Sequence, residues 1–281
     1  MGMLNDENLL YAIEQGSAVL RGFIGDEEPV AGLILGSGLN PFAETLEGAR
    51  FLPFGEVPFM QASTAAGHKG RFVLGRVPGT GRTVLCMQGR LHRYEGCSAM
   101  EVAFPVWVMA QCGIGTLITT NAAGALNPSY AVGDICIMED QINLTGGNPL
   151  VGRTADIMAQ RFVPMLACFD VDLRALARQV ADACGVSVQE GVYLSVLGPS
   201  FETPAEVRLF ASMGADTVAM SVVEEVIAAR HMGMRVLGMS LVTNMACGIA
   251  GSDPNSDEIM DVAAMREADF AALMQGIVAG L

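Results

Sequence analysis

The residues best suited to chemistry lie in the segment 87–96, Met-Gln-Gly-Arg-Leu-His-Arg-Tyr-Glu-Gly. This segment holds Arg90, His92, Arg93 and Tyr94, although the whole chain has only 16 basic residues against 30 acidic ones and only three histidines. Guanidinium, imidazole and phenol groups all donate hydrogen bonds to negatively charged oxygens. Their concentration directly after an apolar run indicates a small anion site. The competing interpretation is a solvated loop with incidental charges, so the prediction depends on the rest of the chain.

The elements that must position these residues follow a regular pattern. Short apolar runs typical of strands alternate with helical patterns, and caps of the Ser/Thr-x-x-Glu type mark two helix starts. Such an alternation predicts an α/β fold with a mostly parallel or mixed central sheet covered by helices on both faces. No linker-like change of composition stands out, so we expect one domain over residues 1–281. The predicted strands are 30–35, 71–75, 83–87, 116–120, 134–138, 191–196, 217–220 and 236–242, and the predicted helices are 98–112, about 170–184, from 203 onward, about 224–232 and 255–279.

Polar or glycine-rich segments follow several of these strands. They are Gly36–Asn40, Gly89–Gly96, Asn121–Gly124, Gly198–Glu202 and Thr243–Gly248. In folds of this class, ligands bind outside the carboxyl ends of the strands. We therefore expect these segments to converge on one binding site.

Several common sites do not fit the sequence. The turn that begins at Gly36 resembles a dinucleotide fingerprint but has Pro41 where the third glycine belongs, which disfavours NAD or FAD. Its backbone N–H groups and the Ser37 hydroxyl could still hold one phosphate. There is no G-x-S-x-G motif for a serine hydrolase and no H-E-x-x-H motif for a catalytic metal. His231, at the end of a predicted helix, receives no role.

Two further side chains allow two interpretations each. Glu202 is either a first-turn carboxylate favoured by a helix dipole or an acceptor for a ligand N–H group. Asn244 is either a turn former or an amide that reads the edge of a heterocycle, because it offers a donor and an acceptor together. The sequence around each residue does not decide between them.

The overall composition restricts the partners. A formal net charge of −14 argues against nucleic acid, whose phosphates require clustered Lys and Arg. No apolar stretch approaches the roughly 18 residues of a membrane span, and acidic residues near the start argue against a signal peptide. The seven cysteines form no C-x-x-C pair, as expected for reduced thiols. We predict a cytoplasmic protein that acts on small molecules.

In combination, these motifs resemble one family, the trimeric-type purine nucleoside phosphorylases. The resemblance runs from about Leu33 to Asn244. It implies phosphorolysis of purine (2′-deoxy)ribonucleosides such as inosine and guanosine, with inorganic phosphate as co-substrate and with no metal or organic cofactor. It also implies a homotrimer. The matching stretches, besides 87–96, are Leu-Gly-Ser-Gly-Leu (35–39), Gly-His-Lys-Gly (67–70), Thr-Asn-Ala-Ala-Gly-Ala-Leu-Asn-Pro (120–128), Asp-Gln-Ile-Asn-Leu (140–144), Gly-Pro-Ser-Phe-Glu-Thr-Pro-Ala-Glu (198–206), Met-Ser-Val-Val (220–223) and Thr-Asn-Met-Ala (243–246).

The resemblance also implies roles for individual residues. His92, Glu202 and Asn244 would be catalytic, with Glu202 accepting from N1–H of the base and Asn244 stabilising the purine at N7 and O6. The phosphate would be held by Ser37, His68, Arg90, His92, the backbone N–H of Ala122, and Ser221. The nucleoside would be contacted by Tyr94, Tyr193, Phe201, Glu202, Met220, Asn244 and Ser256.

The chain departs from the family pattern at three positions. Ser256 stands where a histidine often contacts the sugar 5′-hydroxyl, so the handling of that hydroxyl is open. Met158 aligns with a phenylalanine that a neighbouring subunit contributes, and it keeps an apolar lid without the ring. Glu224 replaces a common proline, which we interpret as a change at a helix start without catalytic meaning.

Two other functions stay open from the sequence. A 5′-methylthioadenosine phosphorylase would explain the missing histidine, but those relatives carry an aspartate where this chain has Asn244. A non-catalytic nucleoside- or phosphate-binding protein would keep the same pocket without turnover. Asn244 together with Glu202 favours a 6-oxopurine substrate.

Overall fold

The computed structural model describes residues 4–65, 67–152 and 155–281, without the side chains of residue 155 and residues 256–258. Its centre is a nine-stranded sheet with the strand order β2-β3-β4-β1-β5-β8-β7-β6-β9. Because β9 also pairs with β5, the last part of the sheet closes on itself. The strands are β1 (Gly32–Leu35), β2 (Glu47–Pro53), β3 (Arg71–Arg76), β4 (Thr83–Gln88), β5 (Thr116–Ala125), β6 (Ile135–Leu144), β7 (Val188–Val196), β8 (Thr217–Ala219) and β9 (Arg235–Met245).

The predicted helices begin within a residue or two of the starts expected from the sequence. Ser98 and Thr203 each form a reciprocal capping box with the glutamate three residues later, which satisfies backbone N–H groups at the first turn. Asp170 caps a third helix through its carboxylate. The helices are α1 (Leu9–Ile24), α2 (Ala99–Gln111), α3 (Ala155–Met158), α4 (Val171–Cys184), α5 (Pro204–Ser212), α6 (Val223–His231) and α7 (Ser256–Ala279).

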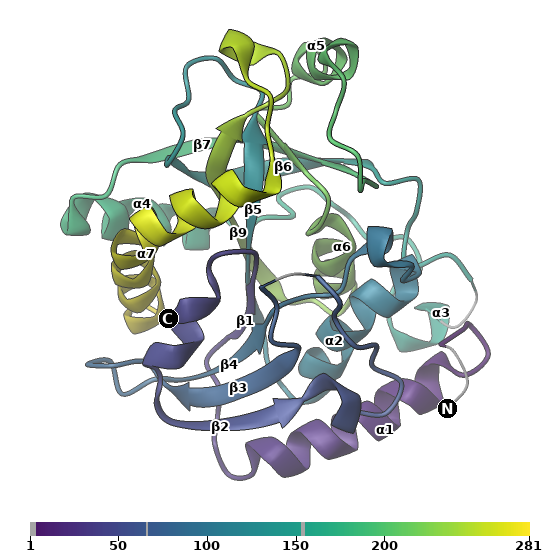
Figure 1. Ribbon diagram of the computed structural model, residues 1–281. Coiled ribbons are helices and arrows are strands. Elements are labelled where there is room, and N and C mark those ends of the chain that lie inside the picture. Colours follow the sequence, from purple (N-terminus) through teal and green to yellow (C-terminus); the bar gives the residue numbers. More distant parts are fainter. Residues whose placement is uncertain (1–3, 66, 153–154) are drawn as a thin grey trace.

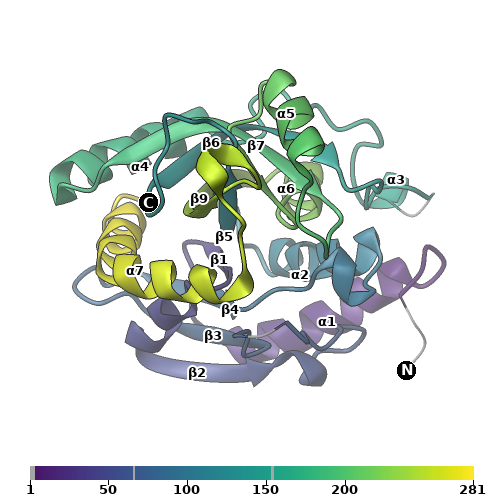
Figure 2. The ribbon, with the colours of Figure 1, turned by 45° about the horizontal axis from the view of Figure 1, so that its top comes forward.

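The helices cover the sheet on both faces, as predicted. Figures 1 and 2 show α4 and α7 together on one side and α1, α2 and α6 on the opposite side. Each side has its own apolar core, with Trp107 of α2 fully buried in one and Leu273 of α7 fully buried in the other. Burial at roughly 25 cal/mol per Å² of apolar surface makes these two cores the main source of stability. No helix within the described residues is long and apolar enough to span a membrane.

The sheet is mixed, and several strands are longer than the sequence indicated, among them β5, β6, β7 and β9. β5 was expected to end at Thr120 but continues to Ala125, because β9 pairs with it in parallel along its whole length. β9 likewise extends to Met245. Such pairing overrides the weak strand propensity of residues 121–125.

Among the strands and α-helices, β2, α1 and the short helix α3 were not predicted. β2 is an edge strand with mostly exposed residues, so it lacks an apolar alternation. α1 buries one face, with Leu9, Ile13 and Leu20 against the first core. It begins at Leu9, and the side chain of the N-cap residue Asn8 makes no capping hydrogen bond. β2 and α1 contain none of the motifs singled out above.

The parallel strands β4, β1, β5 and β9 bring their carboxyl ends to one edge of the sheet. The N-terminal half of α7 lies against this edge. Gly38, with φ of +75°, follows β1, and a Cβ atom there would be only 2.1 Å from Cβ of Ala263 in α7. Only glycine allows this close approach.

Candidate active site

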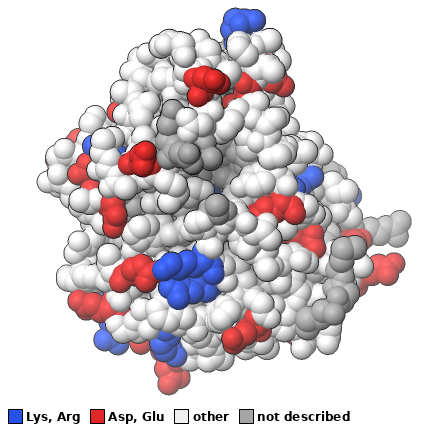
Figure 3. All heavy atoms as spheres, in the orientation of Figure 1, with Lys and Arg blue, Asp and Glu red and all other residues white. Residues whose placement is uncertain are grey.

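A pocket of about 640 Å³, partly open to solvent, lies at this edge of the sheet. All of the segments predicted to converge contribute residues to it. Figure 3 shows a hollow near the centre of the corresponding face, with acidic side chains scattered around it. The pocket is lined by Ser37, Arg90, His92, Tyr94, Asn121, Ala122, Ala123, Gly124, Phe201, Glu202, Val218, Ala219, Met220, Ser221, Thr243, Asn244 and Ile259.

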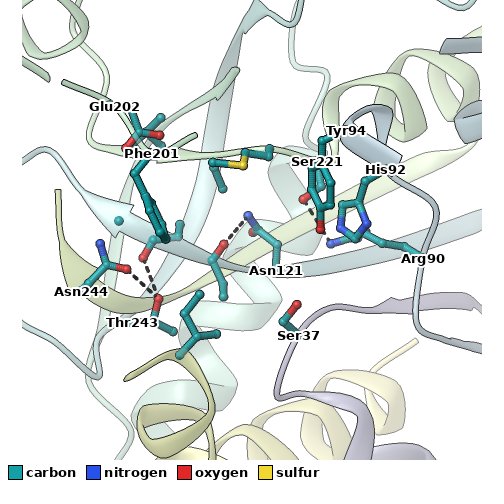
Figure 4. A pocket seen from close by; sticks show the side chains of 17 residues that line it. Ser37, Arg90, His92, Tyr94, Asn121, Phe201, Glu202, Ser221, Thr243 and Asn244 are labelled. Atoms are coloured by element: carbon teal, nitrogen blue, oxygen red, sulfur yellow. Dashed lines mark hydrogen bonds between the residues drawn. The ribbon is translucent and has the colours of Figure 1, made fainter. Parts of the chain in front are cut away.

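Hydrogen-bond donors gather at one end of the pocket. In Figure 4, the side chains of Arg90, His92, Tyr94 and Ser221 lie together, with Ser37 on the adjoining wall. The phenylalanine, glutamate and asparagine of the other motifs lie at the opposite end. The pocket therefore has one end rich in donors for an anion and another with groups that can read a flat polar ligand.

Arg90 is fixed by a nearly complete set of partners. Its side chain is 1% exposed, and it forms a two-pronged ion pair with Glu225 of α6, at 2.9 Å from Nε and 3.0 Å from Nη2. Nη2 also donates to the Thr119 hydroxyl, and Nη1 donates to the Thr120 carbonyl at 2.6 Å. Nη1 reaches the Ser221 hydroxyl at 3.4 Å, which is the weakest of these contacts. The guanidinium is thus held rigidly with Nη1 directed toward the pocket.

His92 is oriented by a carboxylate. Its Nδ1 lies 2.7 Å from Glu95 Oε1, and Glu95 also accepts from the backbone of His92 and of Thr64. Burial acts to raise the pKa of Glu95, but the hydrogen bonds from His92 and Thr64 outweigh it and hold this pKa at about 2. An ionised carboxylate only accepts, so Nδ1 carries the proton and Nε2 is an acceptor in the neutral ring. Burial lowers the pKa of His92, while Glu95 opposes that effect.

His68 lies one layer behind the pocket wall. Its ring stacks on the ring of His92 with centroids 5.2 Å apart, and His92 in turn stacks on Tyr94 at 4.5 Å. Nε2 of His68 is 3.5 Å from the Ser37 hydroxyl. Burial and the nearby His92 and Arg90 lower the pKa of His68 to about 4. His68 is therefore neutral near pH 7 and supports Ser37 through a hydrogen bond.

Ser221 lies on a constrained turn. The next residue, Val222, has φ of +77°, a conformation that costs energy for a β-branched residue. The Ser221 carbonyl accepts from the hydroxyls of Tyr193 at 2.8 Å and Ser195 at 3.0 Å, and from the Val223 backbone at 3.0 Å. These hydrogen bonds hold the turn and aim the Ser221 hydroxyl at the pocket.

Tyr193, which was predicted to contact the nucleoside, is not among the residues that line the pocket. Its side chain is fully buried, because it points from β7 toward the Ser221 turn. It acts on the pocket only through Ser221 and through a 3.5 Å contact with Asn121.

The orientation of the Asn244 amide is set by its neighbours. Oδ1 accepts from the Thr243 hydroxyl at 3.0 Å, and Nδ2 donates to the Met245 carbonyl at 3.0 Å. A carbonyl cannot donate, so the nitrogen must face Met245. One N–H donor and one lone pair of Oδ1 are left for a ligand.

Glu202 and Phe201 lie near this amide at the same end of the pocket (Figure 4). Glu202 is only 8% exposed, and this burial raises the pKa of its carboxyl group. Phe201 is 40% exposed, so its ring face is available for stacking on a flat ligand. Met220 adds an apolar wall.

Two expected contacts lie elsewhere. Met158 ends α3, packs half-buried against the first core, and does not line the pocket of its own chain. The side chain of Ser256 lies outside the described residues, so its predicted role remains a prediction.

The sequence analysis gave no individual role to several residues that build the site. Glu225 and Glu95 hold Arg90 and His92, and Asn121, Thr243 and Ile259 line the wall. Spacing offers one signal, since Glu95 follows His92 by three residues and allows a capping box. The pairing of Glu225 with Arg90 joins distant parts of the chain and leaves no local signal. Among the described residues, no three His, Cys, Asp or Glu side chains gather as a metal site requires.

Comparison with known proteins decides the family. Residues 30–279 match the phosphorylase superfamily. The chain is 45% identical over 267 residues to purine nucleoside phosphorylase 1 of Geobacillus stearothermophilus, covering 95% of this chain and 96% of the relative. It belongs to the purine nucleoside phosphorylases of this superfamily.

Other members of the family support this placement. The purine nucleoside phosphorylase of Bos taurus is 40% identical over 263 residues, which cover 90% of each chain. The solved structure of Schistosoma mansoni purine nucleoside phosphorylase with inosine superimposes with a TM-score of 0.90 at 35% identity, covering 97% of each chain. That enzyme has also been solved with adenosine, with a TM-score of 0.89 and 36% identity over 100% of this chain and 99% of the other. The family predicted from the motifs and the α/β fold are thus confirmed.

Proposed function

We propose that this enzyme cleaves the N-glycosidic bond of purine (2′-deoxy)ribonucleosides with inorganic phosphate, giving the free base and (2-deoxy)ribose 1-phosphate. The observation that carries this function is the division of one pocket into a donor-rich end and an amide–carboxylate end. Phosphate fits the first end, and the purine edge fits the second. The sugar would lie between them, beside Tyr94 and Met220.

The mechanism follows from these positions. Cleavage gives the sugar cationic character and leaves negative charge on the purine. Ser37 and Arg90 would donate hydrogen bonds to the phosphate, and Nε2 of His92 would accept one from the O–H group of the phosphate. Phosphate held in this way would stabilise the cation and attack C1′ from a fixed position. The oriented N–H of Asn244 would donate to O6, and Oδ1 would accept from N7 as this atom becomes protonated. Preorganised groups of this kind contribute roughly 3–4 kcal/mol each. We propose that no metal or organic cofactor takes part.

A 6-oxopurine is the substrate class that these groups favour. The Asn244 nitrogen is directed by the Met245 carbonyl, so its free N–H suits the O6 acceptor of inosine or guanosine. Glu202 can accept from N1–H of the same bases, which adenine lacks. The same orientation disfavours 5′-methylthioadenosine, because its 6-amino group is a donor.

One assay tests the function. Purified protein receives inosine, guanosine, adenosine or methylthioadenosine, each with and without phosphate, and the release of base is measured. Hypoxanthine and guanine released only with phosphate support the proposal. Turnover of methylthioadenosine alone would indicate the rival phosphorylase. Binding without any turnover would indicate a non-catalytic protein.

We further propose that the chain is one domain and works as a homotrimer in the cytoplasm, with Met158 near the pocket of a neighbouring subunit. Large apolar side chains are exposed around α3, including Ile157 at 72%, Phe162 at 81% and Leu166 at 90%. Exposure of this extent is unusual for a monomer and indicates an interface. Light scattering should give about three times the chain mass of 29.5 kDa. A monomer would contradict the proposal.

A further inference from the structure

Helix α6 begins with two consecutive buried glutamates, and each contacts an arginine of the segment 87–96. Glu224 is 1% exposed and Glu225 is 2% exposed. Glu225 pairs with Arg90, whose role at the donor-rich end is described above. Glu224 pairs with Arg93, to which the sequence assigned no role. Glu224 stands where the family commonly has proline, and it places a carboxyl group inside the protein. A substitution that served only to start the helix would not need a buried carboxyl group.

Glu224 and Arg93 contact each other, and both pack against the turn at residues 145–147. Oε1 of Glu224 lies 3.4 Å from Nη1 of Arg93 and accepts from the Thr145 hydroxyl at 2.9 Å. The guanidinium lies directly against Gly147, where a Cβ atom would be 2.0 Å from Nη1. Asn143 donates to the Gly147 carbonyl at 2.9 Å and fixes the turn on which Arg93 rests. Burial raises the pKa of Glu224, and Arg93 and Thr145 oppose that effect.

The place of Arg93 in the chain connects this contact to the pocket. It lies between His92 and Tyr94, whose rings stack on each other and line the pocket wall. Tyr94 lies in the short helical turn Arg93–Glu95, and His92 is the N-cap residue of this turn. Glu95 ties this turn to Thr64 on one side. Arg93 ties it to α6 and the 145–147 turn on the other side.

We infer that Arg93 and Glu224 are positioning residues that hold His92 and Tyr94 in place for phosphate and sugar. This inference rests on the proposed phosphorolysis. Neither residue lines the pocket, so both act through the backbone of the 92–95 turn. Loss of either partner would let this turn shift and would leave the other charge poorly compensated in a buried place.

The test compares Arg93→Met, Glu224→Gln and the double variant with the unchanged enzyme. Each single change should raise the KM for phosphate roughly 5- to 20-fold, with a smaller effect on kcat, because a displaced contact weakens binding of the anion. The double variant should be no worse than the poorer single variant, because the two side chains act through each other. Arg93→Lys keeps a positive charge and should restore part of the phosphate affinity.

The control is Arg235→Met, which removes an ion pair with Asp170 on the surface at the start of β9. It should leave the KM for phosphate unchanged. If the Arg93 and Glu224 variants lose thermal stability but keep the KM for phosphate, the pair is only structural and the inference is overturned. Additive effects in the double variant would overturn the coupling.

Calorimetric titration with inorganic phosphate separates this inference from the proposed function. If the unchanged enzyme binds phosphate but does not cleave inosine, the proposed function fails, and the phosphate affinities of the variants still test the pair. If the enzyme cleaves inosine and the variants bind phosphate normally, only the inference fails.

Discussion

Replacing Asn244 by alanine tests the assigned chemistry most directly. The amide can make four hydrogen bonds, and two of them are made within the chain, to Thr243 and Met245. The remaining donor and acceptor are lost in Asn244→Ala. Removal of one such preorganised group costs about 2.7–4 kcal/mol, or roughly 10²–10³-fold in kcat. We therefore expect a loss of that size in the phosphorolysis of inosine.

The same contacts predict little effect on folding. The Thr243 hydroxyl keeps a second acceptor, the Ala123 carbonyl at 3.4 Å. The Met245 carbonyl still accepts from the Ser252 hydroxyl at 2.7 Å. The free energy of unfolding should fall by only about 1 kcal/mol, because neither partner is left without a hydrogen bond. The affinity for phosphate should not change, because Asn244 lies at the other end of the pocket (Figure 4).

The assay measures kcat/KM for inosine and for the unsubstituted purine ribonucleoside, which lacks O6. The loss in Asn244→Ala should be much smaller with the second substrate, because its wild-type complex lacks the donated hydrogen bond. Nearly normal turnover of inosine by a folded variant would refute the role of Asn244. An equal loss with both substrates would refute the contact with O6.

Three further predictions concern the donor-rich end. Glu95→Gln should lower the pKa of His92 further and raise the KM for phosphate about tenfold, because a hydrogen bond to a charged group is worth about 1.5–3 kcal/mol. NMR titration of the His92 ring measures the pKa, and steady-state kinetics measure the KM. An unchanged pKa of His92 would count against its pairing with Glu95. Arg90→Met should lower the free energy of unfolding in urea by about 3–5 kcal/mol, because it leaves Glu225 buried without its partner. A decrease below about 1 kcal/mol would contradict the importance of this buried ion pair. The pKa of His68 is about 4 in the folded protein, below its ordinary value of 6.5, so the unfolded chain binds more protons between these two pH values. The free energy of unfolding should therefore fall as the pH drops through that window. Urea midpoints measured at several pH values should fall less in His68→Gln than in the unchanged protein, and equal falls would refute the lowered pKa of His68.

The features that local chemistry determines could be predicted from the sequence. The starts of α2 and α5 follow from capping boxes at Ser98 and Thr203, whose partners lie three residues away. The convergence of the glycine-rich and polar segments follows from their positions after strands of one sheet. These predictions needed only short-range pattern and the general geometry of α/β folds.

Features that depend on distant pairing could not be predicted. Glu225 and Glu224 find their arginines across more than a hundred residues, and an isolated sequence gives no sign of either contact. Tyr193 was expected to face the nucleoside, but its neighbours in β7, Leu194 and Ser195, are buried as well. A strand with both faces buried shows no alternation, so the sequence cannot tell which face carries the site.

The contact between Gly38 and Ala263 has a consequence for folding. The pocket takes Ser37 from the first strand loop and Ile259 from α7, and the two segments meet only when the last helix has docked. A chain with α7 detached has an open, incomplete site. Substrate that binds only the complete site stabilises the docked state by mass action. Saturation with nucleoside and phosphate should therefore slow both hydrogen exchange and proteolytic cleavage in α7. The bound substrates would then stabilise the packing of this last helix against the rest of the protein.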